Sequence, residues 1–162
     1  MKIKGVILDV DGVLTDGKKY YLEDKVIKVF SVKDGKGIDL AQKSGIKFAI
    51  ITADKWPEIL YRAKQLNITD VHFDCHDKIK AAQKFCDKYN FTFNDLCFIG
   101  DDVNDIPLLN KVGLAATPKD AVDEVILTIL NNQGMISTHN GGNGAVRNIT
   151  DSIRKYINKD LV

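Results

Sequence analysis

The sequence predicts an α/β fold built on a doubly wound parallel sheet. Short apolar runs that favour strands alternate along the chain with segments of helical period. Such alternation requires crossover connections, which give a parallel sheet covered by helices on both faces. The length of 162 residues is the usual size of one domain, and no linker or internal repeat interrupts the chain. We therefore expect a single domain over residues 1–162.

Five short apolar runs are the predicted strands of this sheet. In chain order they are Val6–Val10, Phe48–Thr52, Val71–Phe73, Leu96–Ile99 and Val112–Ala116. Strands that are buried on both faces read as continuous apolar runs of this kind, because each face is covered by a helix.

A β-hairpin is expected between the first strand and the first helix. The β-prone segments Lys19–Leu22 and Val26–Val32 flank the polar turn Glu23-Asp24-Lys25. This hairpin is an insertion into the regular strand–helix alternation.

Three later segments carry apolar residues at helical spacing. The predicted buried faces are Ile59, Leu60, Ala63 and Leu66; Ile79, Ala82, Phe85, Cys86 and Tyr89; and Val146, Ile149, Ile153 and Ile157. Before the last of these, Gly141-Gly142-Asn143-Gly144 is expected to form a flexible loop.

Composition and charge narrow the class of protein. The formal net charge of +1, with basic and acidic residues interleaved, argues against binding to nucleic acid or to a membrane surface. Neither a signal peptide nor an apolar run of about 20 residues is found. The three cysteines are odd in number and form no CxxC pair, so we expect thiols and a cytoplasmic protein.

Acidic and hydroxyl side chains follow three of the predicted strands. Asp9 and Asp11 end the first, Thr52 and Asp54 end the second, and Asp101-Asp102 end the fourth. Ligands of parallel sheets bind outside the carboxyl ends of the strands, so these groups should gather at one edge. Clustered carboxylates repel unless a cation offsets them, and hard oxygen ligands suit Mg²⁺. A role as helix caps alone would explain single aspartates, but not the doubled ones.

Lys78 opens the helix whose apolar face begins at Ile79. A surface lysine there would be unremarkable, but beside carboxylates and a phosphate it becomes a fixed positive charge. The set then fits phosphoryl transfer through a covalent intermediate. One carboxylate attacks phosphorus, a hydroxyl and an ammonium hold the phosphoryl oxygens, and a second carboxyl group protonates the leaving alcohol.

These residues resemble the four motifs of the haloacid dehalogenase superfamily, in order and spacing. The matching segments are Asp9-Val10-Asp11-Gly12-Val13-Leu14-Thr15, Thr52, Lys78 and Gly100-Asp101-Asp102-Val103-Asn104-Asp105. The resemblance implies a Rossmann-like sheet. It also implies Asp9 as the nucleophile and Asp11 as the general acid and base.

The same resemblance implies the remaining roles. Mg²⁺ would be bound by Asp9, by Asp101 and by the backbone carbonyl of Asp11. Thr52 and Lys78 would bind the phosphoryl group. Asp102 and Asp105 would support the metal site.

Further segments are similar to the capless branch that dephosphorylates 3-deoxy-2-ulosonate phosphates of eight or nine carbons. They are Asp16-Gly17, the hairpin, Asp34-Gly35-Lys36-Gly37-Ile38 and Gly141-Gly142-Asn143-Gly144-Ala145-Val146-Arg147. This branch lacks a cap domain and forms homotetramers through its hairpins. There the end of one subunit helps close a neighbour's site, so Arg147 would meet an acidic sugar. Ala53-Asp54 departs from the Gly-Arg of the octulosonate enzymes, which makes Asp54 a candidate for contact with the sugar.

Two other functions share part of this residue pattern. A receiver-like phosphoacceptor module also uses acidic residues, a threonine and a lysine, but in a different order along the chain. A non-catalytic regulatory or assembly domain, as in the C-terminal part of acylneuraminate cytidylyltransferases, would resemble the family with a degenerate site. The intact set of Asp9, Asp11, Thr52, Lys78 and Asp101 argues against the second.

Overall fold

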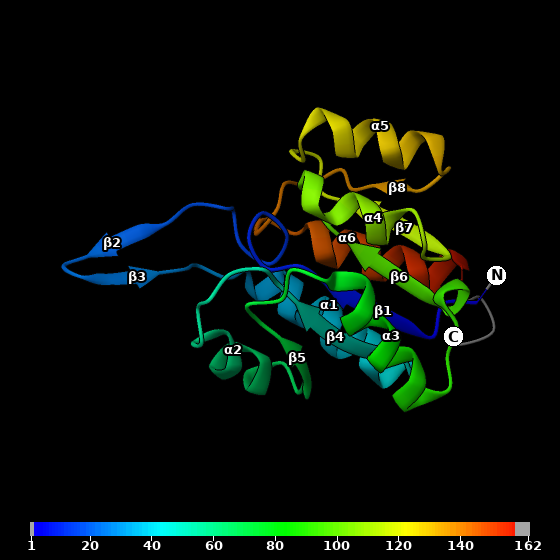
Figure 1. Cartoon of the computed structure of the whole chain (residues 1–162), viewed down its shortest axis with the longest axis horizontal. Helices are drawn as coiled ribbons and strands as arrows, with labels where there is room; N and C mark the ends of the chain where they lie inside the picture. The colour runs from blue at the N-terminus through cyan, green and yellow to red at the C-terminus, as the bar shows by residue number, and fades with distance from the viewer. Residues whose placement is uncertain (1, 158–162) are drawn as a thin grey trace.

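The computed structural model describes the backbone of residues 2–157 and the side chains up to residue 155 (Figure 1). Strands and helices alternate along most of the chain. The strands are β1 Gly5–Leu8, β2 Tyr20–Leu22, β3 Lys25–Ile27, β4 Lys47–Ile51, β5 Asp70–His72, β6 Leu96–Ile99, β7 Leu114–Thr117 and β8 Met135–Ile136. The α-helices are α1 Val32–Lys43, α2 Ile59–Gln65, α3 Lys78–Tyr89, α4 Ile106–Leu109, α5 Asp123–Asn131 and α6 Ala145–Ser152. The remaining elements are short 3₁₀ turns at Phe93–Asp95 and Val103–Asp105 and a π-turn at Ile153–Ile157.

Six strands form one sheet in the order β5-β4-β1-β6-β7-β8, and every pair is parallel. The chain moves outward from β1 in one direction through β4 and β5. It then returns to β6 on the other side of β1 and continues outward. This arrangement confirms the predicted doubly wound parallel sheet. The two-residue strand β8 was not predicted, because two residues carry no readable period.

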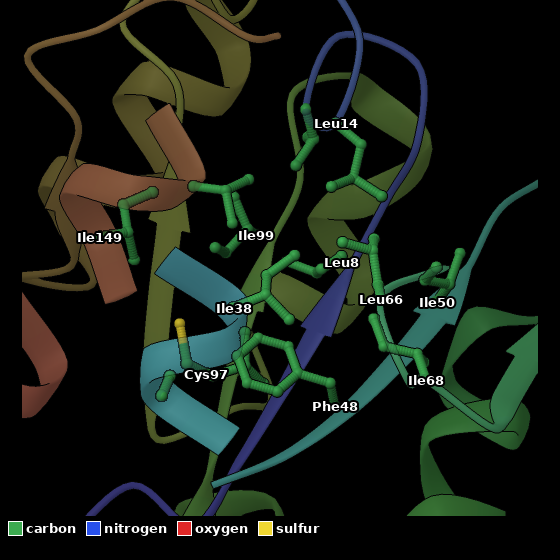
Figure 2. Packing of buried hydrophobic residues seen from close by; sticks show 14 of the residues in the cluster. Leu8, Leu14, Ile38, Phe48, Ile50, Leu66, Ile68, Cys97, Ile99 and Ile149 are labelled. Carbon is green, nitrogen blue, oxygen red and sulfur yellow. The ribbon is translucent and has the colours of Figure 1, made fainter. Parts of the chain in front are cut away.

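Helices cover both faces of the sheet, and the strand residues alternate between two apolar cores. One core joins strand residues such as Leu8, Phe48 and Ile99 to residues of α1, α2 and α6, including Ile38 and Ile149 (Figure 2). The other lies beneath α3, α4 and α5. Each fully buried aliphatic side chain stabilises the fold by roughly 1.5–3 kcal/mol, so both layers hold the strand ends in place.

The predicted helical faces are confirmed with one exception. Ile59, Ala63 and Leu66 of the second segment are buried, but Leu60 is 47% exposed. Helix α2 is only seven residues long and buries a narrow stripe, so a residue next to the stripe remains in solvent. The side chain of Ile157, which we predicted for the last face, lies outside the described residues.

The β-hairpin is present, with β2 and β3 antiparallel and a left-handed residue, Glu23, in the turn. It projects from the body of the molecule as a two-stranded arm (Figure 1). Its apolar side chains are largely exposed, with Tyr21 at 72% and Leu22 at 61%. Among residues 2–157 the hairpin is the main insertion, and no cap domain is formed. None of the described helices has the length and hydropathy to cross a bilayer.

Candidate active site

The carboxyl ends of β1, β4 and β6 meet at a pocket of about 230 Å³. These three strands are neighbours in the sheet, on either side of the point where the winding direction reverses. The pocket is lined by residues that follow the strands, among them Asp9, Asp11, Thr52, Asp54, Asp101 and Asp102. The sequence placed these groups at one edge of the sheet, and the structure brings them together.

Asp9 lies at the base of the pocket and is 6% exposed. One carboxylate oxygen accepts the backbone N–H of Val10 at 2.7 Å, and the other accepts the ammonium of Lys78 at 2.8 Å. Burial raises the pKa of Asp9 to about 6, although Lys78 opposes the shift. The side chain is thus held in one orientation facing the pocket.

Lys78 is buried, because it begins α3 with its side chain turned inward beneath Asp9. Asp77 caps the helix by accepting the N–H of Lys80 at 2.9 Å, which fixes where the first turn starts. The Lys78 ammonium donates to Asp9 and, at 2.5 Å, to Asp105. Burial lowers the pKa of Lys78, but these two carboxylates outweigh that effect and leave the pKa raised. Lys78 therefore stays charged beside Asp9.

Asp105 supports the loop that carries Asp101 and Asp102. It is fully buried, and its second carboxylate oxygen accepts the backbone N–H of Asp101 at 2.9 Å and that of Asp102 at 3.3 Å. With Lys78 on the other oxygen, both oxygens of Asp105 are occupied. Its position agrees with the supporting role that the sequence suggested.

Asp101 is the strongest candidate for a metal ligand. Carboxylate oxygens of Asp9, Asp101 and Asp105 lie within 4.8 Å of one another. Burial, and then the negative charge of Asp9, raise the pKa of Asp101 to about 8. Within residues 2–157 no hydrogen-bond donor pairs with the Asp101 carboxylate. A partly buried, unpaired carboxylate beside a second one fits a hard divalent cation such as Mg²⁺. Asp102 lines the pocket nearby, and its side chain accepts the N–H of Val103 at 2.7 Å.

Close packing of the first loop against Asp101 explains the glycine of the first motif. Gly12 has a φ of +77°, and a Cβ there would lie 1.9 Å from a carboxylate oxygen of Asp101. A side chain at this position would displace the candidate metal ligand. Glycine at position 12 therefore leaves room for the Asp101 carboxylate and adopts the positive φ without strain.

The candidate acid and base, Asp11, lies on the pocket wall and is held by a lysine that the sequence analysis missed. Lys28 extends from the hairpin stem and donates to both oxygens of Asp11 at 2.7 Å. It also pairs with Asp54, and its side chain is 1% exposed. Burial lowers the pKa of Lys28, but Asp11 and Asp54 outweigh that effect and leave the pKa raised. A charged residue within the apolar run Val26–Val32 was the signal available in the sequence.

Thr52 occupies the end of β4, as predicted, and is 3% exposed. Its hydroxyl accepts the backbone N–H of Asp54 at 3.2 Å, which turns the loop after the strand. The hydroxyl proton is therefore directed elsewhere, and Thr52 shares the pocket wall with Asp9. This placement suits a donor to a phosphoryl oxygen.

The glycine-rich segment 141–144 is packed against the first loop, so the prediction of a flexible loop was wrong. A Cβ on Gly141 would lie 1.8 Å from the carbonyl oxygen of Gly12, and the N–H of Gly142 donates to the Val13 carbonyl at 3.0 Å. Asp34 fixes the segment from α1, because its carboxylate accepts the N–H of Gly144 at 3.2 Å. The glycines serve close backbone contact rather than mobility.

Arg147 does not reach the pocket of its own chain. Its guanidinium Nε donates to Asp151 at 2.6 Å along α6, and its backbone N–H donates to Asp34 at 2.8 Å. The structure therefore leaves its predicted contact with a sugar untested.

Comparisons with known proteins agree with this geometry. Residues 67–146 match the model of a family described as haloacid dehalogenase-like hydrolase. The 3-deoxy-D-manno-octulosonate 8-phosphate phosphatase KdsC of Escherichia coli K12 is 35% identical over 92% of this chain and 78% of its own length. The chain belongs to the haloacid dehalogenase-like hydrolase family. The resemblance of its motifs to that superfamily is thereby confirmed.

Solved structures within this family have the same fold. The 3-deoxy-D-manno-octulosonate 8-phosphate phosphatase of Moraxella catarrhalis, determined with a magnesium ion, phosphate and KDO, is 32% identical with a TM-score of 0.88. The match covers 94% of this chain and 86% of that one. The cobalt-bound form of the deoxy-D-mannose-octulosonate 8-phosphate phosphatase YrbI from Haemophilus influenzae is 31% identical with a TM-score of 0.85, over 94% of this chain and 87% of its own.

Family membership also bears on the two alternative functions. Relatives that match nearly the whole chain are named as phosphatases, which favours neither a receiver-like module nor a regulatory domain.

Proposed function

We propose that this protein is a Mg²⁺-dependent phosphatase that hydrolyses the phosphate ester of a 3-deoxy-2-ulosonate sugar acid. The observation that carries the proposal is the placement of Asp9. Its carboxylate lies at the carboxyl end of β1, is oriented by Lys78 and has the unpaired Asp101 carboxylate beside it. The phosphatase names of relatives that align over most of the chain support the same reaction.

In the first step a carboxylate oxygen of Asp9 attacks phosphorus, and the bond between phosphorus and the sugar oxygen breaks. Asp11 gives its proton to that oxygen, so the sugar leaves as an alcohol and Asp9 becomes an aspartyl-phosphate. In the second step Asp11 takes a proton from water, which attacks the phosphorus of the intermediate. Inorganic phosphate leaves, and the Asp9 carboxylate is restored.

The other site residues would bind and orient the phosphoryl group and the metal ion. Lys78 and Thr52 would hold phosphoryl oxygens as negative charge develops on them. Mg²⁺, when bound, supplies positive charge that neutralises the carboxylate and the phosphate. The side chains of Asp9 and Asp101 and the backbone carbonyl of Asp11 would hold it. Asp102 and Asp105 would support these ligands.

The acidic sugar would extend from the phosphate toward the pocket mouth, where Asp54 lies 26% exposed. The Asp54 carboxylate favours hydroxyl groups of a sugar over its carboxylate, because like charges repel. Arg147 supplied by a second copy would provide the matching cation. We expect Asp54 to influence whether the site prefers an eight-carbon or a nine-carbon sugar.

A homotetramer built through the hairpins would bring such a second copy close. The arm formed by β2 and β3 exposes Tyr20, Tyr21, Leu22 and Ile27. Exposed apolar side chains on a projecting arm are typical of a protein–protein interface. The three cysteines of the chain carry free thiols, which supports a cytoplasmic location for the protein.

The proposal is tested by Mg²⁺-dependent phosphate release from octulosonate 8-phosphate, a nonulosonate 9-phosphate and ordinary hexose phosphates. We expect rapid release from one ulosonate phosphate, slow release from hexose phosphates, and loss of both with a chelator. Release that is indifferent to the chelator would refute the metal role. Equal rates on all esters would refute the proposed substrate class.

A further inference from the structure

Lys28 is a buried cation that belongs to neither the metal centre nor the phosphate-binding pair. It follows β3, where the hairpin returns to the body of the protein, and its side chain binds Asp11, whereas Lys78 binds Asp9. A buried lysine requires compensation by negative charge, and the charges that compensate it here are those of Asp11 and Asp54.

The contacts of Lys28 define the position of Asp11. The ammonium lies 2.7 Å from each oxygen of the Asp11 carboxylate, and it lies 5.1 Å from the centre of the Trp56 ring. The other side-chain partner of Asp11, the Thr15 hydroxyl, is 3.4 Å away. Lys28 is therefore the strongest constraint on the orientation of that carboxylate.

Asp54 completes the arrangement from the other side. It pairs with the same ammonium, and the backbone N–H of Asp54 is fixed by Thr52. Without the cation between them, the carboxylates of Asp11 and Asp54 would repel each other across the pocket wall. Asp11 is 35% exposed and could then rotate into solvent.

We propose that Lys28 is a positioning residue that holds the carboxylate of Asp11 in place for proton transfer, with Asp54 as its second anchor. The inference rests on the proposed function, because it concerns the residue that gives and takes the proton there. It predicts that loss of Lys28 impairs the proton-transfer steps and spares the attack by Asp9.

The two steps can be separated with p-nitrophenyl phosphate as the probe. Departure of p-nitrophenolate needs no proton, whereas hydrolysis of the aspartyl-phosphate needs Asp11 to take a proton from water. For Lys28→Met we expect a first-turnover burst of about one p-nitrophenolate per chain, followed by steady-state release about 10²-fold slower than wild type, the scale of general acid–base catalysis. Rapid-mixing absorbance measurements give both phases.

Two further variants exclude a purely structural role. Lys28→Arg should recover much of the steady-state rate, because a guanidinium can bind both carboxylate oxygens. Lys64→Met makes the same substitution at an exposed lysine of α2 and should leave both phases at wild-type values. If Lys28→Met does not fold, Asp54→Asn should show the same selective loss in milder form.

The possible results distinguish a failure of the proposed role of Lys28 from a failure of the proposed phosphatase function. A wild-type protein that releases no p-nitrophenolate and hydrolyses no ulosonate phosphate would refute both. An active wild type with an unchanged steady-state rate in Lys28→Met would refute the inference alone. A burst amplitude that falls in proportion to the steady-state rate would also refute it, because that pattern reports a loss of folded enzyme.

Discussion

Gly141 packs directly on the carbonyl group of Gly12, although the two residues are far apart in the sequence. A Cβ at position 141 would lie 1.8 Å from that carbonyl oxygen and 2.5 Å from its carbon. Gly12 in turn lies against Asp101, so the segment before α6 packs on the loop beside the candidate metal site. Two glycines thus connect the end of the chain to the active site.

Gly141→Ala should therefore affect both stability and activity. The new methyl group forces two backbone segments apart, which we expect to cost about 1–3 kcal/mol in the free energy of unfolding. The turnover number should fall as well, because the loop that carries Asp11 and Gly12 moves. Urea unfolding and steady-state kinetics measure the two effects. Gly35→Ala is the control, because a Cβ at this position of helix α1 would meet only the side-chain ends of Arg62 at 3.2 Å and of Leu66 at 3.4 Å. Equal behaviour of the two variants would contradict the packing role of Gly141.

Asp9→Asn should abolish turnover, because the amide cannot form the aspartyl-phosphate. We expect kcat to fall about 10⁴-fold or more, the scale on which removal of a covalent nucleophile acts. Phosphate release under saturating Mg²⁺ measures the loss. Asp87→Asn, at an exposed position of α3, makes the same change away from the site and should keep the wild-type rate. Turnover by Asp9→Asn at the normal rate would show that another group is the nucleophile.

The carboxylate cluster should make the metal-free protein less stable as the pH rises. The pKa of Asp101 is raised to about 8 and that of Asp9 to about 6, so the folded state holds protons that the unfolded state has released above pH 4. Stability from these two groups is present at low pH and is lost as the pH approaches 8. Thermal unfolding in EDTA between pH 5 and pH 8 measures this loss.

Mg²⁺ should reverse that trend, since it binds the ionised carboxylates and competes with protons. We expect the increase in Tm on adding Mg²⁺ to be larger at pH 8 than at pH 5. Asp101→Asn, which lacks the titrating group, should flatten the pH trend in EDTA and reduce the response to Mg²⁺. An equal response to Mg²⁺ at both pH values would contradict the assignment of Asp101.

Asp105→Asn should weaken Mg²⁺ binding without removing a proposed ligand. Asp105 holds the backbone of Asp101 and the ammonium of Lys78, and loss of such a supporting group lowers metal affinity about 10–100-fold. Calorimetric titration with Mg²⁺ measures the affinity. An unchanged affinity for Mg²⁺ would show that Asp105 serves only to keep Lys78 charged.

The hairpin arm should hold the proposed tetramer together. Light scattering coupled to size exclusion should give a mass near four chains for the wild type. Charged side chains at Tyr21 and Leu22, both largely exposed on the arm, should lower that mass because they would have to be buried without a partner. The double variant Tyr21→Glu, Leu22→Glu tests this, with Tyr61→Glu on α2 as an exposed aromatic control. A monodisperse monomer for the wild type would refute the tetramer.

The sequence by itself determined the layered fold and which side chains gather at the candidate site. Apolar runs followed by Asp9, Thr52 and Asp101 identify strand ends, and parallel topology requires those ends to meet. Apolar runs located five of the six strands of the main sheet, and helical periodicity located α2, α3 and α6, because burial leaves a regular local pattern.

Only the tertiary structure decided which residues hold the side chains of the site in position. Three sets of contacts join residues that are distant in the chain. Lys28 reaches Asp11, Asp105 binds both Lys78 and Asp101, and Gly141 packs on Gly12. The tertiary structure also showed that Leu60 is exposed and that Arg147 pairs with Asp151 outside the pocket. Local sequence cannot report these relationships, because they arise from how whole elements pack against one another.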